Sequence, residues 1–295
     1  MGVGEVAAIL AAGVWASSTI LYKRFSHHLS PLELNLCKGL IAGLMMLVAI
    51  LVLRDGLLPQ QITSWYWLIA SGIFGIAIGD SAYFAALRNI GAARTLIIES
   101  FAPAIAGLLN IFMLGVHLSL QAWMGIVITT LGVLIAVKPR QLLPAVEKQL
   151  YYKGLAFALL AALCQAAGMV MSKGAMQEEG VSSLWAALIR LLSGTLAVAV
   201  VVAWMRDQSF SKAMRMTGVD GRRWLFTAIF FGTFIGLWLQ LLSVKYTDPA
   251  IAQTIFATAP LMVMTIGFIK REPITFNMLM GGCIALVGVA VLLLS

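Results

Sequence analysis

Charged residues are scarce in this chain. Asp, Glu, Lys and Arg make up 11% of its 295 residues, against 61% that are hydrophobic. Soluble proteins carry roughly 25% charged residues, so the composition excludes an ordinary soluble domain. The few acidic and basic side chains that fall inside apolar stretches therefore become the first candidates for a function, because burying them in a membrane is costly.

Cysteines and catalytic motifs are also scarce. The three cysteines (Cys37, Cys164 and Cys283) stand in apolar stretches without metal-ligand spacing, and the three histidines fall between such stretches. The sequence has no phosphate-binding loop and no nucleophile elbow. These absences argue against an ATP-driven pump, a disulfide framework and a metal site. We expect no cofactor and no enzyme activity, and keep a membrane-embedded enzyme as the alternative from a different class.

Long apolar runs are abundant. About 20 apolar residues suffice to cross the hydrocarbon core as a helix, and ten runs reach about that length. They are residues 4–22, 32–53, 65–87, 92–114, 118–137, 153–172, 183–204, 223–244, 249–269 and 274–294. The connections between them are short. We therefore predict an all-α membrane protein with ten transmembrane helices and no extramembrane domain.

The runs form two copies of one pattern. Two glycines, a basic residue and a proline recur 157 positions later, as Gly75, Gly79, Arg88 and Pro103 return in Gly232, Gly236, Lys245 and Pro260. We predict a first repeat over residues 1–140 and a second over residues 150–295. Because five helices is an odd number, the second repeat must enter the bilayer upside down. Inverted repeats are an architecture of secondary transporters, with the substrate site near the midplane.

The basic residues are distributed unevenly across the bilayer. Side B, where the first predicted helix ends, receives sixteen of them, and side A receives only Arg54, Lys173, Arg190 and Lys245. Loops rich in Lys and Arg stay cytoplasmic, so we predict that both termini are non-cytoplasmic. We expect a multi-pass protein of the plasma membrane, the inner membrane in a bacterium. The net charge of +8 then reflects topology and requires no nucleic-acid partner.

Three ionisable residues of the first repeat lie at a similar predicted depth. Lys38, Asp80 and Glu99 come roughly 9–12 Å below side B, given about 1.5 Å of rise per helical residue. One interpretation is a structural ion cluster that holds neighbouring helices together. The other is a proton-carrying carboxylate, since burial and a like-charged neighbour favour the protonated form. Asp80 and Glu99 are therefore the candidate proton-coupling residues.

The second repeat keeps the cation but not the acids. Arg190 corresponds to Lys38, while Leu237 and Phe256 stand where the first repeat has its two carboxylates. Arg190 therefore has no acidic partner in its own half. It either caps backbone carbonyls or snorkels to side A, or it binds a carboxylate or phosphate of the substrate, for which a guanidinium is well shaped. Both interpretations stay open.

Two prolines and several uncharged side chains complete the candidate site. Pro103 and Pro260 occupy equivalent places in the helices predicted at 92–114 and 249–269. Matched interruptions of this kind point to a binding region, so both prolines are candidate hinges. Aromatic and amide groups near the midplane would suit a small amphipathic solute, with helix packing as the alternative for each. The candidate substrate-binding residues are Trp15, Lys38, Tyr83, Gln165, Arg190, Trp238, Gln240 and Gln253.

The stretch from residue 82 to residue 137 resembles the EamA-type repeat of the drug/metabolite transporter superfamily. The features that carry this resemblance are the Ala-Leu-Arg ending at Arg88, then Pro103, Gly125 and Gly132. The second copy matches with Lys245, Pro260, Gly281 and Gly288. The resemblance implies a ten-helix exporter or exchanger of small metabolites, often amino acids. It also implies termini in the cytoplasm, against the charge distribution of this chain.

We therefore predict a secondary transporter that exports amino acids or similar small amphipathic metabolites by alternating access. The alternative with the same fold is an ion-independent exchanger of phosphorylated or nucleotide sugars. The expected partners are a small-molecule substrate and the lipid bilayer. Ten helices can enclose a cavity without a second copy, so a monomer is sufficient, and a homodimer stays open.

Overall fold

The computed structural model describes residues 2–25, 29–55, 58–136, 145–177, 180–205, 218–259, 261–262 and 276–294, and every regular element within these ranges is helical. The first half contains α1 (Val3–Phe25), α2 (Pro31–Leu53), α3 (Ile62–Ser71), η1 (Gly72–Asp80), α4 (Ser81–Glu99), α5 (Ala102–Leu114) and α6 (Leu120–Ala136). The second half contains α7 (Ala145–Ala175), α8 (Ser183–Met205), α10 (Gly218–Ala228), η2 (Ile229–Ile235), α11 (Gly236–Tyr246), α12 (Pro249–Phe256) and α14 (Phe276–Leu293).

Local sequence sets several helix ends. Ser30 begins α2 with a capping box, in which the Ser30 amide donates to the Glu33 carboxylate at 2.7 Å and the Glu33 amide donates to the Ser30 hydroxyl at 3.3 Å. Pro31 follows at a position where its missing N–H removes no helical hydrogen bond. Asp248 begins α12 similarly, because its carboxylate accepts a hydrogen bond from the Ala250 amide at 2.8 Å.

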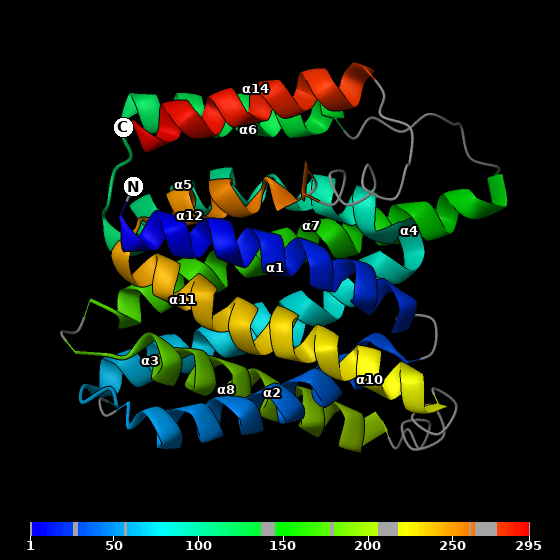
Figure 1. Cartoon of the computed structure of the whole chain (residues 1–295), viewed down its shortest axis with the longest axis vertical. Coiled ribbons are helices and arrows are strands. Elements are labelled where there is room, and N and C mark those ends of the chain that lie inside the picture. Colours follow the sequence, from blue (N-terminus) through cyan, green and yellow to red (C-terminus); the bar gives the residue numbers. More distant parts are fainter. Residues whose placement is uncertain are drawn as a thin grey trace.

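The structure accounts for most of the predicted spans. Six helical stretches are long and apolar enough to cross a membrane: Val3–Tyr22, Pro31–Leu53, Ile62–Gly91, Lys148–Ala175, Ser183–Trp204 and Gly221–Tyr246. Shorter apolar helices cover Ala102–Leu114, Leu120–Ile135 and Leu279–Leu293. Within the described chain only six stretches reach full spanning length, and residues 260 and 263–269 of the run predicted at 249–269 lie outside the described residues, so the count of ten is not confirmed. Both chain termini lie at the same end of the helix bundle (Figure 1).

The two halves interlock through equivalent pairs of elements. α1 packs on α11 as α7 packs on α4, and η1 packs on α8 as η2 packs on α2. Three further pairs, α2 with α8, α5 with α12 and α6 with α14, each join a helix to its own counterpart. Such a contact pattern is expected when an approximate two-fold axis relates the halves. The middle of the molecule is therefore built from both repeats.

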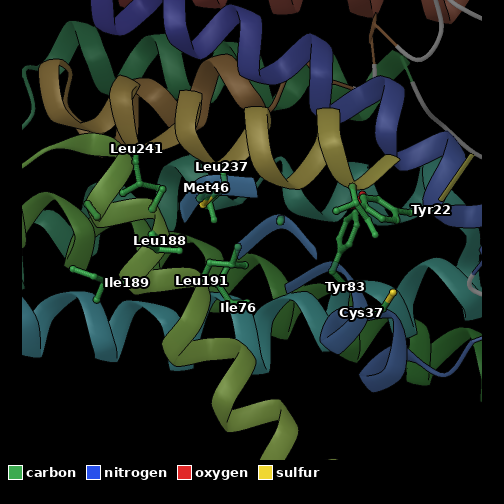
Figure 2. Packing of buried hydrophobic residues seen from close by; sticks show 14 of the residues in the cluster. Tyr22, Cys37, Met46, Ile76, Tyr83, Leu188, Ile189, Leu191, Leu237 and Leu241 are labelled. Atoms are coloured by element: carbon green, nitrogen blue, oxygen red, sulfur yellow. The ribbon is translucent and has the colours of Figure 1, made fainter. Parts of the chain in front are cut away.

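The largest hydrophobic cluster lies between the two halves. Figure 2 shows Met46 of α2, Ile76 of η1 and Leu191 of α8 among its members, with Tyr22 and Tyr83 grouped at another part of it. All five side chains are at most 4% exposed. Tight packing on both sides of η1 holds this segment in place beside the polar residues at the centre.

α6 and α14 lie together at one edge of the bundle (Figure 1). Glycines bring their backbones into contact: a Cβ atom added to Gly132 would lie 2.3 Å from the Ala285 nitrogen, and one added to Gly288 would lie 2.4 Å from the Thr129 nitrogen. Small residues allow this close approach between membrane helices. The repeated glycines of these two helices thus serve packing.

Candidate functional site

Two narrow cavities meet near the centre of the molecule. Trp15, Gln165 and Gln240 line both of them. The first cavity also contains Glu99 and Gln253, and we call it the Glu99 cavity. The second, the Arg190 cavity, also contains Lys38, Asp80, Arg190 and Thr233. The free volumes of about 30 and 10 Å³ leave room for only about one or two water molecules each.

A buried ion pair occupies one wall of the Arg190 cavity. Lys38 of α2 donates to the carboxylate of Asp80, the last residue of η1. The two residues are 3% and 6% exposed. The Lys38 ammonium also lies 5.2 Å from the centre of the Phe84 ring, within range of a cation–π contact. Of the three predicted cluster members, Lys38 and Asp80 are therefore paired directly.

Asn35 links this ion pair to the backbone of η1. Its side-chain amide donates to the Ile76 carbonyl at 2.7 Å and to the Ser81 hydroxyl at 2.8 Å. Asn35 is one helical turn before Lys38 on α2, so both residues face the same segment. This contact fixes η1 against α2 on either side of Asp80. Sequence reasoning did not identify Asn35.

Arg190 lies fully buried against the other wall of this cavity, at 0% exposure. Its Nη1 donates to Met169 Sδ at 3.1 Å and to Ser172 Oγ at 3.4 Å, and its Nη2 donates to Gln165 Oε1 at 3.3 Å. Its Nε has no hydrogen-bond partner among the described residues. Arg190 therefore does not snorkel to the surface, and its recorded hydrogen bonds go to side chains and not to backbone carbonyls.

Glycines provide the space for this guanidinium. A Cβ atom added to Gly75 of η1 would lie 2.5 Å from Arg190 Nη2, and one added to Gly168 of α7 would lie 3.1 Å from the same atom. A Cβ atom at Gly75 would therefore force the guanidinium to shift. Gly75, a glycine of the repeat pattern, thus makes room for the charged group of the opposite half.

Glu99 lies where a helix of the first half is interrupted. It is the last residue of α4, and α5 begins at Ala102, so the helix predicted at 92–114 is broken at Ser100 and Phe101. Pro103 is buried in the first turn of α5. An interruption just before the proline is expected, because Pro103 has no N–H to donate to the Glu99 carbonyl four residues earlier and its ring crowds that carbonyl. The role of Pro103 as a hinge stays a prediction.

The equivalent helix of the second half is interrupted at the matching place. α12 ends at Phe256, the counterpart of Glu99, and Phe256 and Ala257 line the Glu99 cavity. Gln253 lies one turn earlier, and its side-chain amide is buried. The Nε2 atom of this amide has no hydrogen-bond partner among the described residues. Pro260 lies outside the described residues.

Two π-helical segments occur at equivalent places. η1 spans Gly72–Asp80 and η2 spans Ile229–Ile235, and each contributes to the Arg190 cavity. π-helical turns are rare and frequently mark functional sites, because they disturb the regular backbone hydrogen bonds. A sequence pattern based on regular helical spacing does not reveal them. Their repeated glycines, Gly75 and Gly232, were the available signal.

The aromatic candidates have different surroundings. Trp15 lines both cavities and lies 5.4 Å from Tyr83, ring centre to ring centre. Tyr83 is buried behind it, sharing a hydrogen bond of 2.8 Å with Thr19, and lines neither cavity. Trp238 packs against the hydrophobic cluster and also lines neither cavity. The other eight predicted substrate-binding and proton-coupling residues line at least one cavity.

Several polar contacts lie at the end of the molecule that carries the N-terminus. Asn110 of α5 donates to the Asp248 carboxylate at 2.5 Å, and the Thr247 hydroxyl donates to Glu5 of α1 at 3.3 Å. Lys173 donates to the carbonyls of Val244 and Thr247 at 3.0 and 3.3 Å. Two of these contacts join one repeat to the other, so separating the repeats at this end would require breaking them.

The site thus has an acidic group at one end and a basic group at the other. The Glu99 cavity offers a carboxylate that makes no hydrogen bond or ion pair within the described part of the chain, together with amide groups. The Arg190 cavity offers a guanidinium with spare donors, beside an ion pair that is neutral overall. Trp15 forms an apolar wall shared by both. Such an arrangement is suited to a small solute that has a cationic and an anionic group.

Comparisons with known proteins agree with this architecture. The profile of the EamA-like transporter family matches residues 2–138 and 152–294, and so covers both halves. A solved structure titled "Crystal structure of protein" has a TM-score of 0.78, with 16% sequence identity over 99% of this chain and 96% of that chain. This likeness concerns the fold alone. No curated protein matches the chain.

Proposed function

Because the chain belongs to the EamA-like transporter family, it is a membrane transporter of small substrates, and we propose that it exports amino acids or similar small amphipathic metabolites by alternating access. The plasma membrane is the proposed location, with side B in the cytoplasm according to the Lys and Arg distribution. The proposal concerns transport across the membrane and includes no chemical conversion of the substrate.

The observation that carries this proposal is that an acidic side chain and a guanidinium line two adjoining cavities. An α-amino acid has a carboxylate and an ammonium group separated by one carbon atom. Its carboxylate would accept hydrogen bonds from Arg190, whose Nε has no partner among the described residues, and its ammonium group would approach Glu99. Hydrogen bonds between charged partners are roughly twice as strong as neutral ones. Trp15 would cover the apolar part of the solute.

The small size of the cavities supports alternating access. Free volumes of about 30 and 10 Å³ do not admit an amino acid, so the site must widen before it binds or releases one. The interrupted helices beside Glu99 and Phe256 and the segments η1 and η2 are the proposed points of movement, since their backbone hydrogen bonding is already irregular. The contacts between Asn110 and Asp248 would then separate when the site opens at that end.

Proton coupling is assigned to Glu99 or Asp80. Glu99 has no ion-pair partner among the described residues, so it can exchange a proton without leaving a cation behind. Asp80 is paired with Lys38, and protonating it would leave the Lys38 charge unpaired in the interior. We therefore expect Glu99 to be the better carrier, with the structural role of the Lys38–Asp80 pair as the alternative for Asp80.

The first experiment is efflux of labelled amino acids from proteoliposomes, with and without an imposed pH gradient. Efflux that depends on the gradient supports a coupled exporter. Efflux that ignores the gradient but rises with unlabelled solute outside supports exchange. If no amino acid moves, while the reconstituted protein remains folded, the proposed substrate class is wrong.

Two matched variants locate the proton carrier. Glu99→Gln removes one carboxylate, and the double change Lys38→Met with Asp80→Asn removes the other without leaving Lys38 unpaired. We expect Glu99→Gln to lose the gradient effect and also to raise the KM, because Glu99 is the proposed partner of the substrate's ammonium group. The double variant should keep the gradient effect. If both variants retain full gradient dependence, neither carboxylate carries the proton.

A second candidate function keeps the site but changes the substrate. Arg190 has a planar guanidinium, which matches phosphate as well as carboxylate, and this favours an ion-independent exchanger of phosphorylated or nucleotide sugars. Such an exchanger would show stimulation of efflux by a phosphorylated solute on the opposite side, with no response to the pH gradient. A membrane-embedded enzyme would instead convert its substrate in detergent, where transport cannot occur.

A further inference from the structure

A third and larger cavity shares no lining residue with the two central cavities. It has a free volume of about 430 Å³, compared with about 30 and 10 Å³ for the central cavities. Its walls come from the first turn of α2, from η1 and α4, from α7, and from Val202 near the end of α8. We call it the lateral groove.

The walls of the lateral groove are mostly apolar and face outward. Ile78 of η1 and Phe157 and Leu160 of α7 are each 38–39% exposed and line the groove. In a chain that spans a membrane, exposed side chains of this kind face the hydrocarbon region. The component that covers them is therefore lipid, and a groove with apolar walls is suited to an acyl chain.

Two exposed cations stand beyond the groove, toward the end where α2 begins. Arg88 follows the lining residue Ala85 by three positions on α4, and Lys153 precedes the lining residue Phe157 by four positions on α7. Residues at these spacings share a helix face, and α4 and α7 pack against each other. Both cations therefore lie one turn outside the groove and on the same side of it as Ser30, the first residue of the α2 cap.

The acidic residue at this end does not oppose an anion. Glu33 lines the groove but is only 3% exposed, and its carboxylate accepts the hydrogen bond of the Ser30 amide at 2.7 Å. Its charge is held by the capping box, at the N-terminus of α2, where a negative charge is favourable. Among the described residues, the exposed charges at the mouth are thus positive.

From this combination we propose that the lateral groove binds an anionic phospholipid of the bilayer. One acyl chain would lie along Ile78, Phe157 and Leu160, and the phosphate would lie near Arg88 and Lys153. Neutral phospholipids share the acyl chain but lack net negative charge, so the cations should discriminate against them. The site is separate from the central cavities, and binding can be measured whether or not the chain transports amino acids.

The lipid would also contact the segment that presents Asp80. Ile78 and Ser81 line the groove on either side of Asp80, and Ser81 accepts the hydrogen bond of Asn35. An occupied groove would therefore restrict movement of η1. Anionic lipid would act on the central site by this route, through the backbone and without entering the cavity.

Native mass spectrometry of the full chain in detergent tests this proposal. Protein is titrated with phosphatidylglycerol or phosphatidylcholine of the same acyl chains, and the lipid that stays bound is counted. We expect retention of one phosphatidylglycerol in preference to phosphatidylcholine. The double variant Arg88→Gln with Lys153→Gln should lower that preference about 30-fold, since each cation near a charged membrane surface contributes roughly five-fold.

A matched control removes a positive charge from another face of the same helix. Lys148 is exposed on the same helix as Lys153, nine residues before Phe157 and so on the opposite face. Lys148→Gln should change the preference less than about two-fold. Equal retention of the two lipids by the unaltered protein, or an unchanged preference in the double variant, would overturn the proposal.

The apolar part of the groove is tested separately. Ala85→Phe places a large side chain in the groove, whereas Leu159→Phe enlarges a side chain of α7 that is exposed but does not line it. Only Ala85→Phe should reduce lipid retention, with thermal unfolding confirming that both variants fold. In parallel, water-soluble glycerol phosphate is added to the unaltered protein. Displacement of the lipid by glycerol phosphate alone would show an anion site and contradict a lipid site.

Discussion

The two repeats place different chemistry on the same backbone frame. In the first half, Asp80 at the end of η1 pairs with Lys38, and Glu99 ends α4. In the second half, Leu237 and Phe256 occupy the equivalent positions, and Arg190 has no acidic hydrogen-bond partner within the described residues. One half thus supplies the acids, and the other supplies a guanidinium with spare donors.

This difference shows which features the repeat preserves. The segments η1 and η2 match in position, and so do the helix interruptions after Glu99 and after Phe256. Both belong to the backbone, which has to move in each half if the halves exchange conformations. The charged side chains differ between the halves. In the proposed function, the shared backbone features would allow movement in both halves, and the differing side chains would bind the two ends of the substrate.

The largest expected effect on stability comes from replacing Asp80 by leucine, the residue found at the equivalent position of the second half. Asp80→Leu alone leaves Lys38 as an unpaired buried charge, and we expect it to lower the free energy of unfolding by about 3–5 kcal/mol. Adding Lys38→Met should recover most of that loss, because it removes the unpaired charge and leaves apolar side chains in its place. Denaturant unfolding in detergent measures both variants.

The double variant separates stability from coupling. If it unfolds like the unaltered protein and keeps its pH-gradient dependence, the Lys38–Asp80 pair is a structural device. If the double variant is as unstable as Asp80→Leu alone, apolar contacts do not replace the stabilising effect of the Lys38–Asp80 pair.

Arg190 is the next test of the comparison. Arg190→Gln removes the only charge of the second half that lines either cavity within the described chain. We expect this change to raise the KM of transport about 10- to 100-fold, because a hydrogen bond to a charged group contributes about 1.5–3 kcal/mol. Arg190→Lys should recover only part of the loss, because lysine keeps the charge but lacks the fork. An unchanged KM in folded Arg190→Gln would mean that Arg190 serves packing alone.

Much of the candidate site follows from the sequence. Ionisable residues in apolar runs single out Lys38, Asp80, Glu99 and Arg190, and the repeat points to the same places in both halves. Depth along a helix is easily estimated, because each residue adds a fixed rise. The rotation of each helix about its own axis cannot be estimated from the sequence in this way. This rotation decides which of the two carboxylates, Asp80 or Glu99, pairs with Lys38.

Other features could not be predicted for physical reasons. η1 and η2 change the number of residues per turn, so regular spacing misplaces the side chains that follow them. The space around Arg190 depends on Gly75, which lies in the other repeat and far away in the sequence. The interruption at Ser100 and Phe101, by contrast, could be anticipated from Pro103, because a proline disturbs the helical turn before it.

The smallest effects compare two tryptophans that the sequence does not distinguish. Trp15 lines both cavities, whereas Trp238 packs against the hydrophobic cluster. Trp15→Leu should raise the KM about 2- to 10-fold, the range expected when aromatic contacts of about 0.5–1.5 kcal/mol are lost. Trp238→Leu should change the KM less than about two-fold while lowering the free energy of unfolding by about 1–3 kcal/mol. The two variants are compared by efflux from proteoliposomes and by unfolding in detergent. A KM effect of Trp238→Leu as large as that of Trp15→Leu would show that the substrate reaches beyond the two cavities, so that an open conformation brings Trp238 into contact with it.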